Sequence, residues 1–310
     1  NDDTHKRIKK YFDKFFYVNN LSDEEVRNLA KENKIDIAIH RNGYSQNSRN
    51  SLFAKKFAPL QISFLGYPGT MGAPFIDYII GDKIVIPDEH KKYFSEKIIY
   101  LPNTYYPTYN ERKISETIYA KKNFGIDEDA FVFGSFNNSY KISVIEFSLW
   151  MKLLDKIKNS FLILLIDDEF TKKNLLREIN KYSIDLKRVK FLNFINIEEH
   201  LARHKLIDLY LDTFNYNGHT SSIDALFSGV PVITKKGNSF TARVCASILN
   251  SFEMPEMITS TEDEYFKLAL DIATNKEKFL KLKSSVMNNI KSSSLFKTQN
   301  YVTHLEKGFA

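Results

Sequence analysis

The sequence has little cysteine and no long apolar run. Cys245 is the single cysteine among 310 residues, which excludes an internal disulfide and any metal site built on several thiolates. A reducing compartment such as the cytoplasm fits this composition. No apolar stretch approaches the roughly 20 residues that a membrane-spanning helix needs, and we find no signal peptide or internal repeat. We therefore expect no membrane partner.

Charge of one sign is not concentrated either. The chain has 44 Lys and Arg against 38 Asp and Glu, a net charge of +6 and a pI of about 9.0. The two signs are mixed along the sequence, so an anionic small ligand is favoured and a nucleic acid is not expected. A hydrophobic content of 43% is that of an ordinary globular protein, and the length allows two domains.

Strand-like and helix-like segments alternate in the first part of the chain. Ser22 and Glu25 form a capping box that predicts a helix reaching about residue 33. This alternation, with Gly-rich turns, predicts a parallel sheet covered on both faces. The expected strands are 35–40, 58–65, 75–80 and 98–101, with a short helix at 89–94.

The second part repeats the pattern more regularly. Polar residues 103–117 show no periodicity and are interpreted as the link between two domains. Ser143 and Glu146 again form a capping box. The expected strands are 131–136, 161–166, 189–192, 207–211 and 230–234, and the later helices are 240–249, two within 262–290, and 298–307. We predict an α/β fold with domains at 1–110 and 118–295 and a C-terminal helix at 296–310.

The stretch 207–229 reads as strand, loop and helix. Its helix opens at His219, Thr220 and Ser221. A helix start after a parallel strand offers unpaired N–H groups and the positive end of a dipole, which together bind phosphate. The hydroxyls of Thr220 and Ser221 and the imidazole of His219 add donors. A capped helix without any ligand is the alternative.

Ligands of open parallel sheets bind outside the carboxyl ends of the strands. Lys141 follows the strand 131–136, and His200 and Arg203 lie one turn apart after 189–192. Asp224 lies one turn into the helix that His219 opens. These residues suit a diphosphate and the hydroxyls of a ribose. Each also has a simpler interpretation: a solvated lysine, a surface pair, and a carboxylate that favours its helix dipole.

Together these residues resemble the catalytic region of the protein O-GlcNAc transferase and Spindly family of glycosyltransferases. The resemblance runs from about Asp36 to Leu305, and two blocks, LGYPGT and NGHT, carry most of its specificity. The matching blocks are NGYSQNSR (42–49), FLGYPGTMGAPFIDYIIGD (64–82), YFSEK (93–97), FGSFNNSYKI (133–142), EEHLAR (198–203), LDTFNYNGHTSSID (211–224), GVPVIT (229–234) and ARVCASIL (242–249).

The resemblance implies a GT-B architecture, in which two Rossmann-like domains face each other across a cleft and the first is incomplete here. It implies inverting transfer of a sugar from a nucleotide sugar to Ser or Thr of an acceptor protein or peptide, without a metal or another cofactor. The roles carried over are diphosphate binding and leaving-group stabilisation by Lys141, phosphate contacts by Asn138, His219, Thr220 and Ser221, ribose contact by Asp224, nucleobase contacts by His200 and Arg203, a sugar pocket at Leu65 and Gly66, and an acceptor side at Ser45 and Arg49.

Three departures from the family pattern qualify these expectations. Only 41 residues precede Asn42, whereas the family has further βα units and a tetratricopeptide superhelix there, so we expect a longer parent protein. Ile197 stands where O-GlcNAc members have Lys, and Asn138 where they have Gln. His219 is typical of those members and missing from the fucosyl-transferring Spindly branch. UDP-GlcNAc is therefore favoured over GDP-fucose, and a non-catalytic nucleotide-sugar-binding module remains the other alternative.

Overall fold

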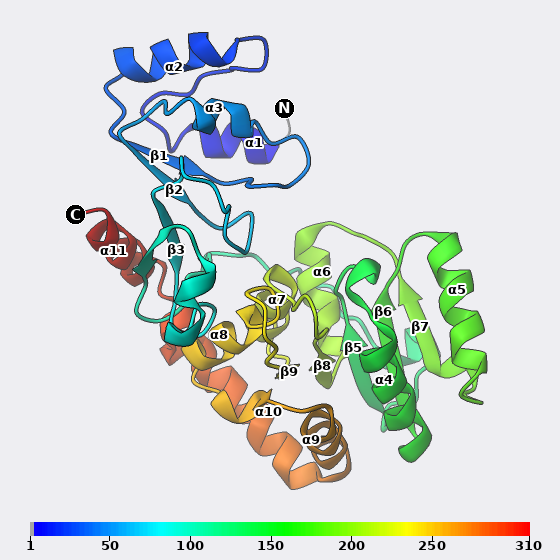
Figure 1. Cartoon of the computed structure of the whole chain (residues 1–310). Coiled ribbons are helices and arrows are strands. Elements are labelled where there is room, and N and C mark those ends of the chain that lie inside the picture. Colours follow the sequence, from blue (N-terminus) through cyan, green and yellow to red (C-terminus); the bar gives the residue numbers. More distant parts are fainter. Residues whose placement is uncertain (1–2) are drawn as a thin grey trace. The chain divides into compact units, whose positions relative to one another are not determined.

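The computed structural model describes residues 3–310 and contains two compact units. The first runs through Ile80 and adds Lys92–Ile98, and the second consists of Gly81–Lys91 and Ile99–Ala310. Strands and helices alternate along the chain in both, as Figure 1 shows. The predicted α/β pattern is confirmed in each half of the sequence.

The first sheet has four strands in the order β1-β2-β3-β4, and both β1–β2 and β2–β3 are parallel. The predicted capping box is present, because Glu25 N donates to Ser22 Oγ over 3.2 Å and Ser22 N donates to Glu25 Oε2 over 2.7 Å. All four predicted strands form, with shorter bounds. The elements are α1 (Asp3–Lys9), α2 (Asp23–Glu32), β1 (Ile37–His40), α3 (Asn50–Ala54), β2 (Leu60–Ser63), β3 (Tyr78–Gly81), η1 (Asp88–Tyr93) and β4 (Lys97–Tyr100).

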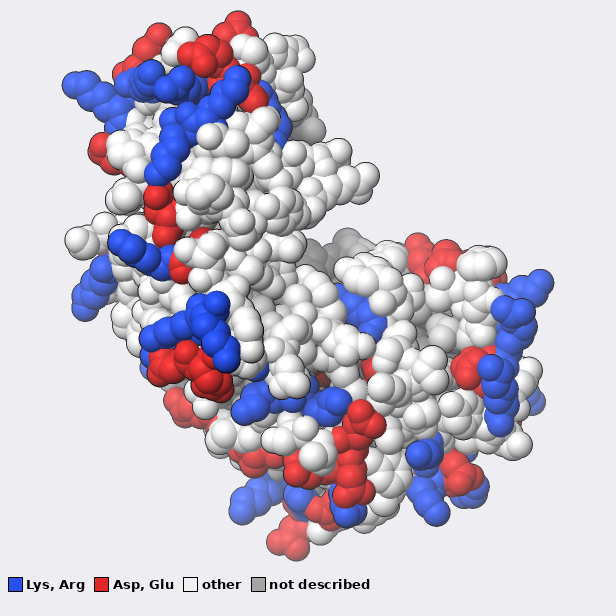
Figure 2. All heavy atoms as spheres, viewed as in Figure 1, with Lys and Arg blue, Asp and Glu red and all other residues white. Residues whose placement is uncertain are grey.

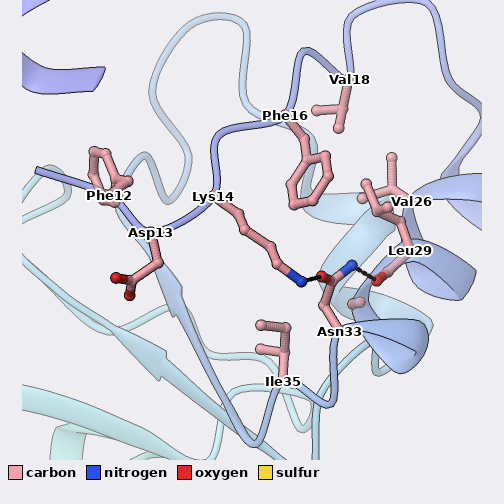
Figure 3. Close-up of a pocket in the computed structure, with 10 residues that line it drawn as sticks. Phe12, Asp13, Lys14, Phe16, Val18, Val26, Leu29, Asn33 and Ile35 are labelled. Carbon is pink, nitrogen blue, oxygen red and sulfur yellow. Dashed lines mark hydrogen bonds between the residues drawn. The ribbon is translucent and has the colours of Figure 1, made fainter. Parts of the chain in front are cut away.

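An open apolar pocket of about 480 Å³ lies in the first unit, between residues 12–18 and α2 (Figure 3). Phe16 and Val26 are among its lining residues. Lys14 crosses it and donates from Nζ to Asn33 Oδ1 over 2.6 Å, while Asn33 Nδ2 donates to Leu29 O over 2.8 Å. These bonds hold the segment before α2 against the end of that helix.

The second sheet has six strands in the order β10-β9-β8-β5-β6-β7, and every neighbouring pair is parallel. The five predicted strands are confirmed, whereas the two-residue β10 is an addition. The strands are β5 (Phe131–Ser135), β6 (Ser160–Leu165), β7 (Val189–Leu192), β8 (Leu209–Leu211), β9 (Val232–Lys235) and β10 (Ile258–Thr259). Because the chain moves outward from β5 to β7 and then returns to β8, the strand order reverses between β5 and β8. Crevices at such switch points are where open α/β sheets bind ligands.

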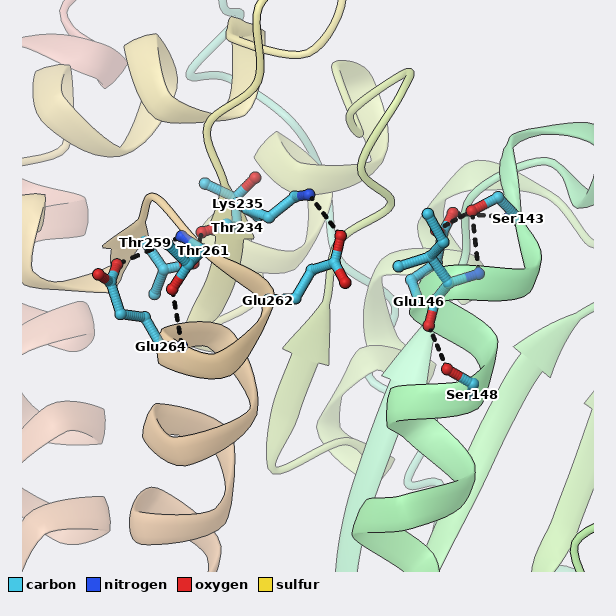
Figure 4. Close-up of polar contacts among 10 residues, drawn as sticks. Ser143, Glu146, Ser148, Thr234, Lys235, Thr259, Thr261, Glu262 and Glu264 are labelled. Carbon is cyan, nitrogen blue, oxygen red and sulfur yellow. Dashed lines mark hydrogen bonds and ion pairs between the residues drawn. The ribbon is translucent and has the colours of Figure 1, made fainter.

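Local signals in the sequence fix several helix starts in this unit. Ser143 N donates to Glu146 Oε1 over 2.7 Å, and Glu264 N donates to Thr261 Oγ1 over 3.1 Å, so α4 and α9 both begin with capping boxes (Figure 4). The longer helices are α4 (Val144–Lys156), α5 (Glu169–Asn180), α6 (Ile197–Arg203), α7 (Thr220–Phe227), α8 (Val244–Ser251), α9 (Glu262–Thr274), α10 (Lys276–Ser292) and α11 (Thr298–Phe309), and the short ones are η2 (Lys121–Phe124), η3 (Ser139–Lys141), η4 (Leu186–Arg188), η5 (His204–Leu206), η6 (Pro255–Met257) and η7 (Ser294–Phe296).

Two segments differ from expectation. Helix α8 begins at Val244 rather than 240, because a turn bonded from Arg243 N to Phe240 O precedes it. Residues 103–117, interpreted as a link, pack within the second unit. Tyr105 is 1% exposed, and Thr108 is buried and donates to Leu295 O. These partners are remote in sequence, so nothing local revealed the burial.

Basic and acidic side chains are interspersed on the face shown in Figure 2. The net positive charge of the sequence is therefore not gathered into one stripe on that face, in line with the mixed charge pattern of the chain. Among the helices of residues 3–310, none is long and apolar enough to span a bilayer.

Asp82 anchors the entry into the second unit and provides a test of this packing. Its carboxylate is 1% exposed and accepts from Ile84 N, Val85 N, Tyr105 N and Ser247 Oγ at 2.6–3.0 Å. Asp82→Ala leaves these buried donors unpaired, so we expect it to lower the free energy of unfolding by about 3 kcal/mol, measured by urea titration.

The matched control is Asp88→Ala. Asp88 pairs only with the exposed side chains of Lys83 and Lys91, so its loss is expected to change stability little. Equal effects of the two substitutions would show that the Asp82 contacts do not hold the segment.

Candidate functional site

A buried carboxylate lies at the reversal point between β5 and β8. Asp212 directly follows β8 and is 0% exposed. Its Oδ1 accepts from Asn137 Nδ2 over 3.1 Å and from Gly218 N over 2.5 Å, and its Oδ2 accepts from Thr234 Oγ1 over 2.6 Å. Burial raises the pKa of Asp212 to about 6, while these donors oppose the increase. The carboxylate thus ties β5, β8, β9 and the loop after β8 together.

Lys141 lies above this carboxylate at the end of η3. Its Nζ donates to Asn217 O over 3.0 Å and lies 4.1 Å from the centroid of the Tyr216 ring. Burial lowers the pKa of Lys141, and the charge of Asp212 opposes that shift. The ammonium is bound to one carbonyl and to no carboxylate among the described residues, so its charge is available to an anionic ligand.

His219 immediately precedes α7, and no side chain caps that helix. The sequence suggested a Ser or Thr cap, but the cap position is His219 itself. Burial and the nearby charge of Lys141 lower the pKa of His219 to about 3, so the imidazole is neutral at pH 7. Within residues 3–310 its buried Nε2 has no hydrogen-bond partner. The start of α7 therefore combines uncapped N–H groups with an unpaired imidazole nitrogen.

The loop before α7 is too tightly packed for any residue but glycine at 218. A Cβ on Gly218 would lie 2.3 Å from Ser222 Oγ and 3.0 Å from Asn137 Oδ1. Ser221 Oγ donates to Asn137 Oδ1 over 2.5 Å. Asn137 therefore connects Asp212 to the helix start, a role that sequence reasoning missed because it selected the exposed neighbour, Asn138.

Asp224 lies one turn into α7 and is 4% exposed. Its Oδ1 accepts from Arg112 Nη2, and their side chains are 6% and 14% exposed. Burial raises the pKa of Asp224, and the charge of Arg112 lowers it. Arg112 was not among the predicted residues, since it lies in the segment interpreted as a link. In the same segment, the Tyr106 hydroxyl hydrogen-bonds Thr220 Oγ1 over 2.9 Å.

His200 and Arg203 form a packed pair on α6 rather than a surface pair. Arg203 is 3% exposed and donates through Nε and Nη2 to His200 Nδ1 over 3.1 and 2.7 Å. Because guanidinium groups only donate, the proton of the neutral His200 ring must be on Nε2. Burial and the charge of Arg203 lower the pKa of His200 to about 4. His200 also packs on Phe136, with ring centroids 5.2 Å apart.

Ser45 and Arg49 lie in the first unit, between β1 and α3. Ser45 is exposed. The Arg49 guanidinium donates to Val18 O, Leu21 O and Asp23 Oδ1 at 3.0, 3.1 and 2.5 Å. In this structure Arg49 clamps the segment before α2, and its assignment to the acceptor side stays a prediction.

Leu65 and Gly66 follow β2 in the same unit. Leu65 has a φ of 74°, which is strained for a branched side chain. A Cβ on Gly66 would lie 1.9 Å from Arg41 O, so the two motif-bearing loops touch backbone to backbone. This close approach explains the glycine of the LGYPGT block, while the expected sugar contact stays a prediction.

The second unit thus gathers most of the predicted residues around one helix start. Lys141, His219, Thr220, Ser221 and Asp224 lie at or near the reversal point between β5 and β8, with His200 and Arg203 on the adjacent α6. A cation, uncapped N–H groups and a carboxylate suit a phosphate joined to a polyol. Among residues 3–310, no three His, Cys, Asp or Glu side chains are arranged as metal ligands.

Comparison with known proteins gives a family match across almost the whole chain. The model described as "Glycosyl transferase family 41" matches residues 1–114 and 106–305. The "Probable UDP-N-acetylglucosamine--peptide N-acetylglucosaminyltransferase SEC" of Arabidopsis thaliana is 31% identical over 100% of this chain and 32% of its own length. The protein of the same description named SPINDLY, also from Arabidopsis thaliana, is 27% identical over 93% of this chain and 32% of its own length.

A solved structure, titled as the K341M mutant of the Thermobaculum terrenum O-GlcNAc transferase, superposes with a TM-score of 0.89 and 26% identity, covering 100% of this chain and 59% of that one. The predicted GT-B fold class is thereby confirmed. The chain spans about a third of the length of the two plant relatives.

The neutral histidines predict how stability depends on pH. The folded pKa of His219, about 3, lies below its ordinary value of 6.5, so the unfolded chain binds the proton more readily than the folded one. This contribution to stability is complete above pH 6.5 and is lost as the pH falls toward 3. Urea unfolding followed from pH 7 to pH 4.5 should show the loss.

Replacing His219 isolates its share. His219→Gln is expected to show a smaller loss of stability between pH 7 and pH 4.5 than the unsubstituted protein. The exposed His304, a site with no assigned role, provides the comparison substitution His304→Gln. Identical pH slopes for all three proteins would contradict a buried, neutral His219.

Proposed function

The chain belongs to glycosyl transferase family 41, and from this premise we propose that it transfers a sugar from a nucleotide-sugar donor to Ser or Thr of an acceptor protein or peptide. The observation that carries the proposal is the uncapped start of α7 beside the Lys141 ammonium, at the strand-order reversal of the second sheet. Family membership supplies the reaction class, and this geometry supplies a place for the diphosphate of the donor.

The proposed reaction is a single displacement that inverts the anomeric carbon. The acceptor hydroxyl forms a bond to that carbon, the bond from the carbon to the diphosphate breaks, and the hydroxyl proton passes to a base that we do not assign. Negative charge grows on the departing diphosphate. Lys141 and the start of α7 are fixed in advance where this charge develops, which lowers the barrier. We propose that these groups stabilise the leaving group without a metal ion.

Each remaining residue has a proposed part in donor binding. Thr220 and Ser221 hold phosphate at the helix start, and Asp224 accepts from the ribose. His200 presents its Nε2 proton to an acceptor on the nucleobase, because Arg203 occupies Nδ1. Leu65 and Gly66 line the sugar position, and Ser45 and Arg49 the acceptor side.

We propose UDP-GlcNAc as the donor. Two relatives are named for UDP-N-acetylglucosamine, and His219 is present in the NGHT block. Calorimetric titration with UDP and with GDP tests this choice. Tighter binding of UDP supports it, whereas tighter binding of GDP would move the proposal to fucose transfer. Donor binding without transfer in the intact protein would identify a non-catalytic binding module.

Lys141→Ala tests the role of the ammonium. We expect kcat for sugar transfer by the intact protein to fall about 10²- to 10³-fold, because one preorganised group at the developing charge is lost. Transfer of labelled sugar to protein measures the effect. Lys152→Ala, which removes an exposed lysine from α4, is the matched control and should leave kcat unchanged. An unchanged kcat in Lys141→Ala would disprove the role.

A further inference from the structure

The segment that carries Arg112 is anchored on both sides within the second unit. Before Arg112, Thr108 donates to Leu295 O and accepts at its carbonyl from Thr298 Oγ1 over 3.2 Å. After it, Ser115 N donates to Glu198 O over 3.1 Å. The Arg112 side chain therefore projects from backbone held at both ends.

Arg112 makes two contacts with α7. Its Nη2 donates to Asp224 Oδ1, and its guanidinium carbon lies 5.2 Å from the centroid of the Phe227 ring. Asp224 and Phe227 are three residues apart on the helix and so share a face. A guanidinium that is both paired and stacked has little freedom to turn, and the carboxylate that it binds is fixed with it.

This pairing leaves half of the Asp224 carboxylate without a protein partner. Arg112 binds Oδ1, and no hydrogen bond from residues 3–310 reaches Oδ2. An acceptor with this little exposure is expected to be filled by a ligand or a water. Asp224 lies one turn after Thr220, at the helix start where we place the diphosphate, and one turn matches the reach from a phosphate to the adjoining ribose.

We propose that Arg112 is a positioning residue of the donor site, which holds Asp224 by one carboxylate oxygen and directs the other to a ribose hydroxyl of a ribonucleoside diphosphate. The inference rests on the proposed function, since it requires such a donor at α7. Arg112 does not contact the reacting atoms in this arrangement. Its effect is on affinity and on the choice of ribose over a sugar that lacks hydroxyls.

A purely structural ion pair would behave differently. If Arg112 served only to pack its segment against α7, its removal would weaken every nucleotide alike or act on stability alone. A positioning role instead couples Arg112 to the ribose hydroxyls. The ratio of affinities for UDP and 2′,3′-dideoxy-UDP separates the two roles, because the two ligands differ only in those hydroxyls.

The test is calorimetric titration of the intact protein and its variants with both ligands. We expect the unsubstituted protein to prefer UDP. In Arg112→Ala, UDP affinity should fall about tenfold while dideoxy-UDP affinity stays within twofold, so that the preference collapses. Asp224→Asn should lose the same preference, and the double variant should lose no more. Lys113→Ala removes the exposed neighbouring charge and should retain the preference.

Other results would overturn the inference. An unchanged preference in Arg112→Ala, or an equal loss for both ligands, rules out the positioning role while leaving the proposed function intact. Failure of the unsubstituted protein to bind UDP or GDP overturns the proposed function and this inference together. If Arg112→Ala does not fold, Arg112→Lys keeps the charge without the planar fork, and its preference must also fall.

Discussion

The buried carboxylate of Asp212 is the constraint on which the site depends. An ionised group without exposure is stable only when donors surround it, and here the donors come from three separate places: Asn137 after β5, Thr234 in β9, and the backbone of Gly218. Satisfying that one group folds the loop after β8 back over the sheet. The same fold places the Asn217 carbonyl under Lys141 and sets the direction in which α7 begins.

The charges around α7 follow from this arrangement. A helix start favours negative charge, yet the nearest carboxylates are either buried below it, as Asp212 is, or paired, as Asp224 is with Arg112. His219 is neutral, and its low pKa results in part from Lys141. The region thus keeps one exposed-side cation and an uncapped dipole with no internal anion to quench them. An external anion is the complement that the arrangement lacks.

Features with local causes could be predicted from the sequence, and features with remote causes could not. The capping boxes at Ser22 and Ser143 depend on residues three positions apart, and both form. Apolar runs likewise gave the strands. Residues 103–117 were misread because their partners, such as Leu295, lie far along the chain, so neither periodicity nor composition indicates burial. The choice of Asn138 over Asn137 failed for a related reason: adjacent asparagines look alike until the sheet turns one inward.

The remote contacts also change how the site is understood. The family motifs draw attention to α6, α7 and the loop after β5, yet Tyr106 and Arg112 reach α7 from a segment with no recognised motif. Because that segment is tied down at Thr108 and Ser115, its conformation is part of the site rather than a tether. Residues that shape a ligand position can therefore lie in sequence that looks like a connection. Their role shows only when the hydrogen-bond partners of each buried polar group are accounted for.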